Sequence, residues 1–255
     1  MNLKNSMKIF SELCETIKTL REPDGCPWDS KQTSKSLIPY LLEETYEVIE
    51  AIEKENYLEI KEELGDLFLH LIFQSQIYEE KNYFKLSEVL EDINLKLKNR
   101  HPEVFNIESF GNRLSWEERK QKEKNRDKFL DGVPKSLPAL TRASRIQEKA
   151  AQVGFDWDNI QPIWEKVEEE IDELKIAIKL KDENQIKDEM GDVLFSFVNL
   201  ARFLNIQAES SLKNTISKFE YRFHIIEKEL ARKNKSLSDA SLKEMDEIWN
   251  KSKNI

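Results

Sequence analysis

Hydrophobic residues recur along most of this sequence with a period near 3.6, the spacing that places them on one face of an α-helix. Between residues 64 and 72 they fall at the i, i+3, i+4, i+7 and i+8 positions of a helix that faces a core, and the spacing returns between residues 190 and 201. The pattern predicts an all-α protein. The residues expected to face inward include Leu41, Leu42, Val48, Ile49, Ile52, Leu64, Leu67, Phe68, Leu71 and Ile72, and later Met190, Val193, Leu194, Phe197, Val198 and Ala201.

Breaks in this pattern divide the chain into separate helices. A Pro- and Gly-containing stretch at residues 22–29 ends the first helix, a break near Asn56 ends the second, and Pro102 follows the fourth. Residues 102–113 are expected to form a loop. The first predicted helix covers about residues 6–20, and the second runs from residue 36 or 39 to the break near Asn56. A long helix that includes residues 64–72 follows. The later helices are expected at about 85–100, 115–128, 140–153, 161–180, 183–204, 208–232 and 239–251.

Residues 131–138 are the clearest linker in the chain, because Gly132, Pro134 and Pro138 fall within eight residues. We place the domain boundary there. The prediction is an N-terminal domain over residues 1–130, a linker over 131–138 and a C-terminal domain over 139–255.

Glycine and proline are scarce, at 6 and 7 of 255 residues, while charged residues make up 35%. A chain with so few turn formers must spend most of its length in helices. The closest two glycines, Gly111 and Gly132, are 21 residues apart. The glycine-rich loops that cradle phosphates in many nucleotide-binding proteins therefore cannot form here.

The formal charge of -9 argues against a protein that coats nucleic acid, since such binding needs a basic face. No apolar run reaches ten residues, so no membrane segment is expected. Cys14 and Cys26 are the only cysteines, too few for a four-cysteine zinc site or a disulfide scaffold, which favours a reducing compartment. We expect a soluble, cytoplasmic protein.

An internal repeat carries the candidate chemistry. Shifting the sequence by 126 residues aligns residues 41–72 with 167–198 without a gap, with ten of 32 positions identical. One acidic pattern would be typical of a solvated helix face. Two copies in register, each with a glycine at the same position, favour a functional site. The shared pattern E-E-x-x-E, followed after fifteen residues by E-x-G-D, contains Glu43, Glu44, Glu47, Glu63 and Asp66 in the first copy and Glu169, Glu170, Glu173, Glu189 and Asp192 in the second.

The spacing of these carboxylates indicates a metal site. Residues three apart share a helix face, so Glu170 lies beside Glu173, and Glu189 beside Asp192. A short break near residue 182 makes the two helices antiparallel neighbours, which can bring the pairs together. Four clustered carboxylates repel one another unless a hard divalent cation binds, and an all-oxygen ligand set suits Mg²⁺. The corresponding second candidate site consists of Glu44, Glu47, Glu63 and Asp66.

Gly65 and Gly191 each lie between two predicted ligands in mid-helix, where glycine costs about 1 kcal/mol relative to alanine. Our hypothesis is that the missing side chain lets another backbone, the metal or a nucleotide approach the helix.

These features resemble the MazG family of all-α nucleoside triphosphate pyrophosphohydrolases. The resemblance rests on the tandem carboxylate pattern, on Gly25-Cys26-Pro27-Trp28-Asp29 before the first copy and on Val153-Gly154-Phe155-Asp156-Trp157 before the second. It covers nearly the whole chain. It implies tandem four-helix-bundle-like domains, Mg²⁺-dependent hydrolysis of NTPs and dNTPs to a monophosphate and pyrophosphate with broad base tolerance, and a homodimer. In tandem members the C-terminal repeat is usually credited with catalysis.

The resemblance also implies roles for basic and aromatic side chains. Lys166 resembles the lysine that meets the phosphates, Lys218 and Arg222 match a phosphate-binding pair, and Trp249 with Lys253 match residues that complete the nucleotide site. The family's basic position on the second carboxylate helix is Gln185 here, with Lys187 two residues on. The predicted substrate contacts are Lys166, Glu169, Gln185, Lys187, Asp188, Asp192, Lys218, Arg222, Trp249 and Lys253.

The first repeat departs from this pattern at one position, because Tyr40 stands opposite Lys166. The other basic and aromatic pairs have counterparts in Lys96 with Arg100 and in Trp116 with Lys120. Loss of a phosphate-meeting cation favours the second repeat as the catalytic one and the first as structural or weakly active.

The predicted mechanism is metal-assisted hydrolysis, in which Lys166, Lys218 and Arg222 stabilise the charge of the leaving pyrophosphate. Glu169 is a candidate acceptor for the proton of the attacking water. Two other classes fit the same residues: a Mg²⁺-nucleotide-binding regulator without turnover, and a helical interaction protein that needs neither metal nor Lys166. Pyrophosphate release in the presence of nucleotides and Mg²⁺ distinguishes the three.

Overall fold

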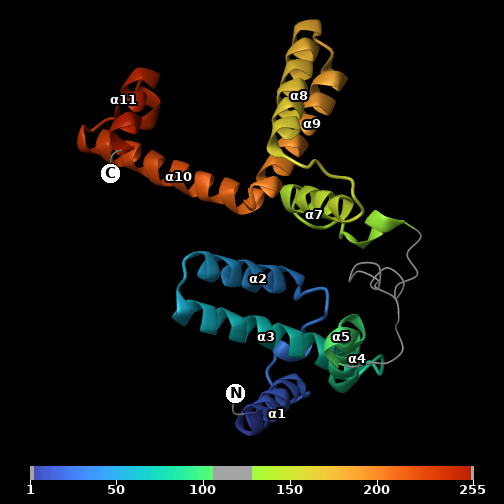
Figure 1. The fold of residues 1–255 in the computed structure, drawn as a ribbon. Helices are drawn as coiled ribbons and strands as arrows, with labels where there is room; N and C mark the ends of the chain where they lie inside the picture. The colour runs from blue at the N-terminus through green and yellow to red at the C-terminus, as the bar shows by residue number, and fades with distance from the viewer. Residues whose placement is uncertain (1–2, 106–127, 254–255) are drawn as a thin grey trace. The chain divides into compact units, whose positions relative to one another are not determined.

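The computed structural model describes residues 3–105 and 128–253, and every regular element within these ranges is a helix (Figure 1). The chain folds as two compact units, residues 1–120 and 121–255. Across the described ranges, no helix combines the length and apolar character needed to cross a membrane.

The first unit is built on an antiparallel pair of helices, α2 (Ile38–Glu53) and α3 (Tyr57–Glu80). The Asn56 side chain starts α3 by accepting hydrogen bonds from the backbone N–H groups of Leu58 and Glu59, as a helix N-cap does. Around this pair lie α1 (Leu3–Arg21), the 3₁₀ turn η1 (Asp29–Lys31), α4 (Leu86–Arg100) and α5 (Pro102–Phe105).

The core of the first unit lies where α1 crosses α3, and it consists of Ile17, Leu37, Ile72, Phe73 and Ile77. A single guanidinium ties the loop after α1 to this core. Arg21 donates hydrogen bonds to the Asp29 and Gln32 carbonyls at 2.7 and 3.2 Å and pairs with Glu80 on α3 at 2.7 Å. The loop that carries the first glycine-containing motif is therefore fixed against α3.

The second unit repeats the antiparallel pair as α8 (Ile160–Leu180) and α9 (Glu183–Phe203). Lys181 ends α8 in the left-handed conformation with φ 58°, and the Asp182 side chain caps α9 by accepting from two backbone N–H groups. The turn is thus only two residues long. The other elements are η2 (Phe129–Gly132), α7 (Ala139–Gln152), α10 (Ala208–Arg232), η3 (Leu237–Asp239) and α11 (Leu242–Ser252).

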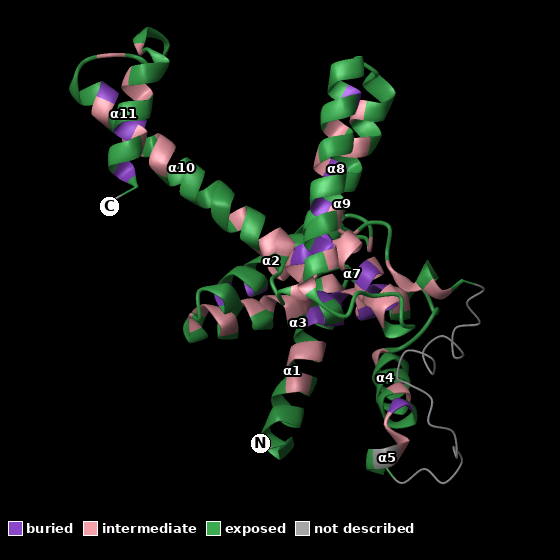
Figure 2. Cartoon of the chain, turned by 45° about the horizontal axis from the view of Figure 1, so that its top comes forward, coloured by how far each residue is buried: buried purple, intermediate pink, exposed green. Residues whose placement is uncertain are grey.

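Two small cores stabilise the second unit. Ile163 and Val167 of α8 pack against Leu200 of α9, while Ile226 and Leu230 near the end of α10 pack against Ile248 of α11. Both views show α11 folded back on the far part of α10 (Figures 1 and 2). The α8–α9 pair and the α10–α11 pair therefore have separate cores.

Most predicted helices are confirmed to within a few residues of their ends. Residues 208–232 form α10 as predicted. The expected loop over 102–113 is wrong at its start, because Pro102 begins the one-turn helix α5. The predicted helix over 115–128, with Trp116 and Lys120, lies almost entirely outside the described residues. The predicted linker at 131–138 lies within the second unit and begins as part of η2.

The prediction that the apolar stripes face a core is only half correct. Val48, Ile72, Val193 and Val198 are buried, but other stripe residues are well exposed to solvent. In Figure 2 much of the α8 and α9 ribbon has the green colour of exposed residues. Among the described residues, neither the α2–α3 pair nor the α8–α9 pair has enough neighbouring helices to surround it. The exposed positions correspond between the two repeats, with exposures of 43 to 53%: Ile52 and Ile178, Leu64 and Met190, Phe68 and Leu194, Leu71 and Phe197.

Candidate functional site

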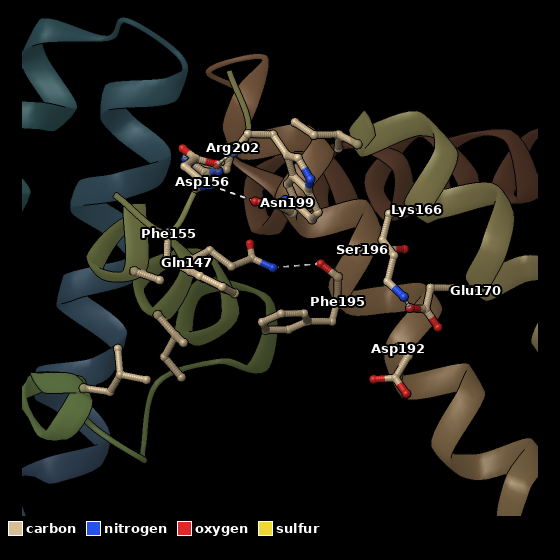
Figure 3. A pocket seen from close by; sticks show the side chains of 15 residues that line it. Gln147, Phe155, Asp156, Lys166, Glu170, Asp192, Phe195, Ser196, Asn199 and Arg202 are labelled. Carbon is tan, nitrogen blue, oxygen red and sulfur yellow. Dashed lines mark hydrogen bonds and ion pairs between the residues drawn. The ribbon is translucent and has the colours of Figure 1, made fainter. Parts of the chain in front are cut away.

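The α8–α9 pair brings three of the four predicted metal ligands together. Glu170, Glu173 and Glu189 each offer a carboxylate oxygen, and these oxygens lie within 4.8 Å of one another. Glu170 is only 6% exposed, although a glutamate side chain is charged at neutral pH in water. The fourth residue, Asp192, lies one turn after Glu189 and lines a cavity together with Glu170 (Figure 3). The predicted spacing therefore produces a carboxylate cluster.

Crowding of these carboxylates is visible in their electrostatics. Desolvation, followed by the negative charges of Glu173 and Asp192, raises the pKa of Glu189 above its ordinary value. A divalent cation at the cluster would remove this repulsion, because it favours the ionised form of every member.

Lys166 already supplies one positive charge to the cluster. Its Nζ atom lies 2.6 Å from Glu170 Oε1 and 3.0 Å from Glu169 Oε1, and Figure 3 shows it pointing toward Glu170. Hydrogen bonds to these two carboxylates hold the pKa of Lys166 above its ordinary value. The ammonium is thus the cationic partner of the buried Glu170 carboxylate.

The first unit repeats the cluster without the lysine. Glu44, Glu63 and Asp66 offer oxygens within 4.8 Å of one another, and Glu47 forms a hydrogen bond with Glu44. Desolvation and the neighbouring carboxylates raise the pKa of Glu44 to about 7. Tyr40 stands at the position of Lys166 and supplies no charge, so Glu44 forms no counterpart of the Glu170 ion pair with any of the described residues.

A cavity of about 340 Å³ adjoins the carboxylates in the second unit, between α7, α8 and α9 (Figure 3). Lys166, Glu170 and Asp192 lie at one end. The rest is mostly apolar, with Phe155, Trp157 and Phe195 among its lining residues. A volume of this size is typical of a small-molecule pocket.

The motif before the second copy forms one wall of this cavity. Gly154 has φ 86°, and the N–H groups of Gly154 and Phe155 donate to the carbonyls of Ala151 and Ala150, the hydrogen bonds of a helix end with a left-handed glycine. The Asp156 carboxylate then accepts two hydrogen bonds from the Arg202 guanidinium, at 2.5 and 3.0 Å, which lower its pKa. The loop is thereby fixed to α9.

Four polar residues of this cavity were missed by the sequence analysis: Gln147, Ser196, Asn199 and Arg202. Gln147 of α7 donates from Nε2 to the Phe195 carbonyl at 2.9 Å, and Asn199 accepts from Arg202 Nε at 2.9 Å. One signal could have indicated the α9 residues, because Ser196 and Asn199 interrupt an otherwise apolar stripe. Nothing in the local sequence distinguishes Gln147, whose role depends on α7 packing against α9.

The other predicted substrate residues form a second group on α10 and α11. The Arg222 guanidinium lies over the Trp249 ring, 5.6 Å from its centroid, and Phe219 packs against the same ring at 5.1 Å. Lys253 donates to Asn250 at 2.8 Å, and Lys218 is exposed. These contacts join Arg222, Trp249 and Lys253 to residues of the α10–α11 pair, so their place beside the carboxylates stays a prediction.

Gln185, Lys187 and Asp188 lie exposed on the first half of α9, close in sequence to Glu189. The negative charge of Asp188 contributes to the raised pKa of Glu189. Contact of these residues with a substrate stays a prediction.

Comparison with protein families agrees with the site. A family model described as the MazG nucleotide pyrophosphohydrolase domain matches residues 32–105 and 159–225, more than half of the chain. The chain belongs to the MazG family. The two matched segments contain both carboxylate patterns, together with Lys166, Lys218 and Arg222, so the MazG domain is present twice.

Individual MazG relatives cover the chain from end to end. It is 43% identical over 253 residues to the nucleoside triphosphate pyrophosphohydrolase/pyrophosphatase MazG of Thermotoga maritima, and the aligned residues span 98% of both proteins. It is 40% identical over 253 residues to the nucleoside triphosphate pyrophosphohydrolase of Escherichia coli K12, spanning 95% of this chain and 96% of that protein. The uncharacterized protein YabN of Bacillus subtilis is 43% identical over 251 residues, which make up 96% of this chain and 51% of YabN.

Proposed function

We propose that the second unit hydrolyses nucleoside triphosphates and deoxynucleoside triphosphates to the monophosphate and pyrophosphate, with Mg²⁺ as cofactor and broad base tolerance. The observation that carries this proposal is the cluster of Glu170, Glu173 and Glu189, with Lys166 bound to one of its members. Two relatives that match almost the whole chain bear the name of this activity.

The donor set fits Mg²⁺. Three carboxylate oxygens within 4.8 Å of one another, with Asp192 one turn away, are hard ligands of the kind that this ion prefers. Lys166 lies 2.6 Å from Glu170, which indicates that the cluster accommodates a positive charge. Bound to these four residues, Mg²⁺ would neutralise triphosphate oxygens and lower the pKa of a water molecule.

The remaining chemistry belongs to the chain itself. Lys166 can exchange a carboxylate for a phosphate oxygen and stabilise the charge that develops on the leaving pyrophosphate. Glu169 is exposed and lies outside the three-carboxylate cluster, and transfer of Lys166 from its 3.0 Å contact with Glu169 to a phosphate would free this carboxylate to accept the proton of the attacking water. Lys218 and Arg222 would add positive charge to the phosphate region.

The test is pyrophosphate release by the full chain with each NTP and dNTP in the presence of Mg²⁺. We expect release by the wild type and a loss of about 100-fold or more in Glu173→Ala and Asp192→Ala, because each removes a metal ligand. Asp172→Ala is the matched control, since Asp172 lies on the same helix but pairs with Lys175 at the surface. Tight nucleotide binding without pyrophosphate release would indicate a regulator instead. If the protein neither binds nucleotides nor releases pyrophosphate, both functions are contradicted.

We also propose that the protein is a homodimer in which a second copy covers the exposed apolar face of α8 and α9. Met190, Leu194 and Phe197 on α9 are all more than two-fifths exposed, an unusual cost for a protein that stays monomeric. One face that is apolar on every copy suits a two-fold interface, in which the same patch meets itself.

Both cysteines are free thiols, and on that ground we propose that the protein acts in the cytoplasm.

A further inference from the structure

The apolar part of the cavity beside the carboxylates has no role in the proposed metal and phosphate chemistry. Phe155 and Asp156 lie at one end of the cavity, and Lys166 and Glu170 lie at the other (Figure 3). A group covalently attached to a triphosphate bound at the carboxylates would therefore lie within reach of this cavity.

Gln147 presents an unused hydrogen-bond acceptor at this cavity. Its side chain is 8% exposed, and Nε2 is fixed on the Phe195 carbonyl at 2.9 Å, but Oε1 is buried without a hydrogen-bond partner among the described residues. Figure 3 shows the carboxamide reaching from α7 into the space in front of α9. A buried carbonyl without a partner is costly, so a donor supplied by a ligand would restore the missing hydrogen bond.

The first repeat indicates the shape of the chemical group that fits at the positions of the cavity. Tyr40 and His70 stand at the positions of Lys166 and Ser196 in the repeat, and Trp28 follows Gly25 by three residues as Trp157 follows Gly154; Lys166, Ser196 and Trp157 all line the cavity. The Tyr40 ring lies 6.5 Å from the His70 ring at an interplanar angle of 11°, and it meets Trp28 edge-on at 5.9 Å. At these positions the first unit thus accommodates stacked flat rings from its own side chains.

We propose that the cavity receives the base of the nucleotide and that Gln147 is a specificity-determining residue, whose Oε1 accepts a hydrogen bond from an amino or imino N–H of the base. The inference rests on the proposed function. Each of the common bases carries at least one such donor, on N6 of adenine, N4 of cytosine, N1 or N2 of guanine, or N3 of uracil and thymine. One acceptor among apolar and aromatic walls therefore tolerates all of them and disfavours a base with no donor.

The experiment compares ATP with purine riboside 5′-triphosphate, which differs from ATP only in lacking the amino group. For the wild type with Mg²⁺ we expect kcat/KM for pyrophosphate release to be at least about ten-fold higher with ATP, because the analogue leaves Oε1 unpaired. In Gln147→Leu the two values should become equal within a factor of about two, mainly through a fall for ATP. Gln152→Leu, the same change at an exposed position of α7, should keep the wild-type ratio.

The outcomes separate this inference from the function on which it rests. No release from ATP by the wild type would overturn the proposed function itself. Release with a wild-type ratio near one, or a ratio that Gln147→Leu leaves unchanged, would overturn the inference alone. If Gln147→Leu fails to fold, the wild-type comparison still decides. Loss of the ratio in Trp249→Ala, with retention in Gln147→Leu, would place the base on α11 instead.

Discussion

Gly191 lies in the middle of α9 between Glu189 and Asp192, at a position where the chain itself does not require glycine. A Cβ atom added there would meet no atom within 4 Å, and the same holds for Gly65 in the first repeat. Neither residue has a positive φ, in contrast to Gly154. Close approach by another described part of the same unit therefore does not explain these glycines.

We predict that Gly191→Ala increases the free energy of unfolding of the metal-free protein by about 1 kcal/mol, the difference in helix propensity. The same change should lower pyrophosphate release several-fold, because the methyl group occupies space between two ligands. Chemical denaturation and the release assay measure the two effects. Gly65→Ala is the control and should gain stability with unchanged turnover. A Gly191→Ala variant that is more stable and fully active would show that the glycine has no role.

The α8–α9 pair carries both the carboxylate cluster and the exposed apolar face of the proposed dimer. Its short turn, capped by Asp182, makes the helices antiparallel and sets the carboxylates opposite one another. Four pairs of corresponding residues, from Ile52 and Ile178 to Leu71 and Phe197, remain exposed on both repeats. A repeated exposed stripe indicates that each helix pair contributes part of a larger bundle, which agrees with the bundle-like domains expected from the sequence.

Leu194→Glu should convert the proposed dimer into a monomer, because a carboxylate buried without a partner in an apolar interface is strongly unfavourable. Sedimentation velocity at several protein concentrations measures the change. Leu242→Glu is the matched control, since Leu242 is 79% exposed at the start of α11 and should leave the assembly intact. A wild type that remains monomeric at every concentration would contradict the proposed interface, as would a Leu194→Glu protein that stays dimeric.

Across the whole molecule, the two units repeat a helix pair that carries carboxylates, but they differ in the residues around these carboxylates. Both gather carboxylates on a helix pair, but only the second places a lysine on them and an adjoining cavity with an unused acceptor, among the residues that the structure describes. In the first, Tyr40 stacks with His70 at the corresponding positions, and the pKa of Glu44 rises to about 7. This difference supports the expectation that catalysis belongs to the second unit.

Glu47→Ala and Asp66→Ala should therefore keep pyrophosphate release within about two-fold of the wild type, whereas Glu173→Ala should lose it. The physical reason is that the first cluster has tyrosine in place of the lysine that would stabilise the leaving group. Steady-state release by the full-length variants measures this. A loss in Glu47→Ala comparable to that in Glu173→Ala would show that both repeats turn over substrate or that the first supports the second.

The helices, the duplication and the carboxylate cluster could be predicted from the amino-acid sequence, because each depends on residues close together along one helix or on the short turn between two. The hydrophobic period, the caps at Asn56 and Asp182 and the i, i+3 spacing are local features, and the folded helices retain them. The substitution of Tyr40 for Lys166 is also visible in the repeat alone.

The burial of individual apolar residues and the cavity beside the carboxylates depend on contacts between residues far apart in the sequence. Gln147 meets Phe195 across 48 residues of sequence, and Asp156 meets Arg202 across 46, so neither contact has a local signature. The cavity exists because α7 packs against α9 and the Gly154 turn directs the next residues back over it. Burial depends in the same way on how many helices surround a face, which periodicity along one helix does not contain.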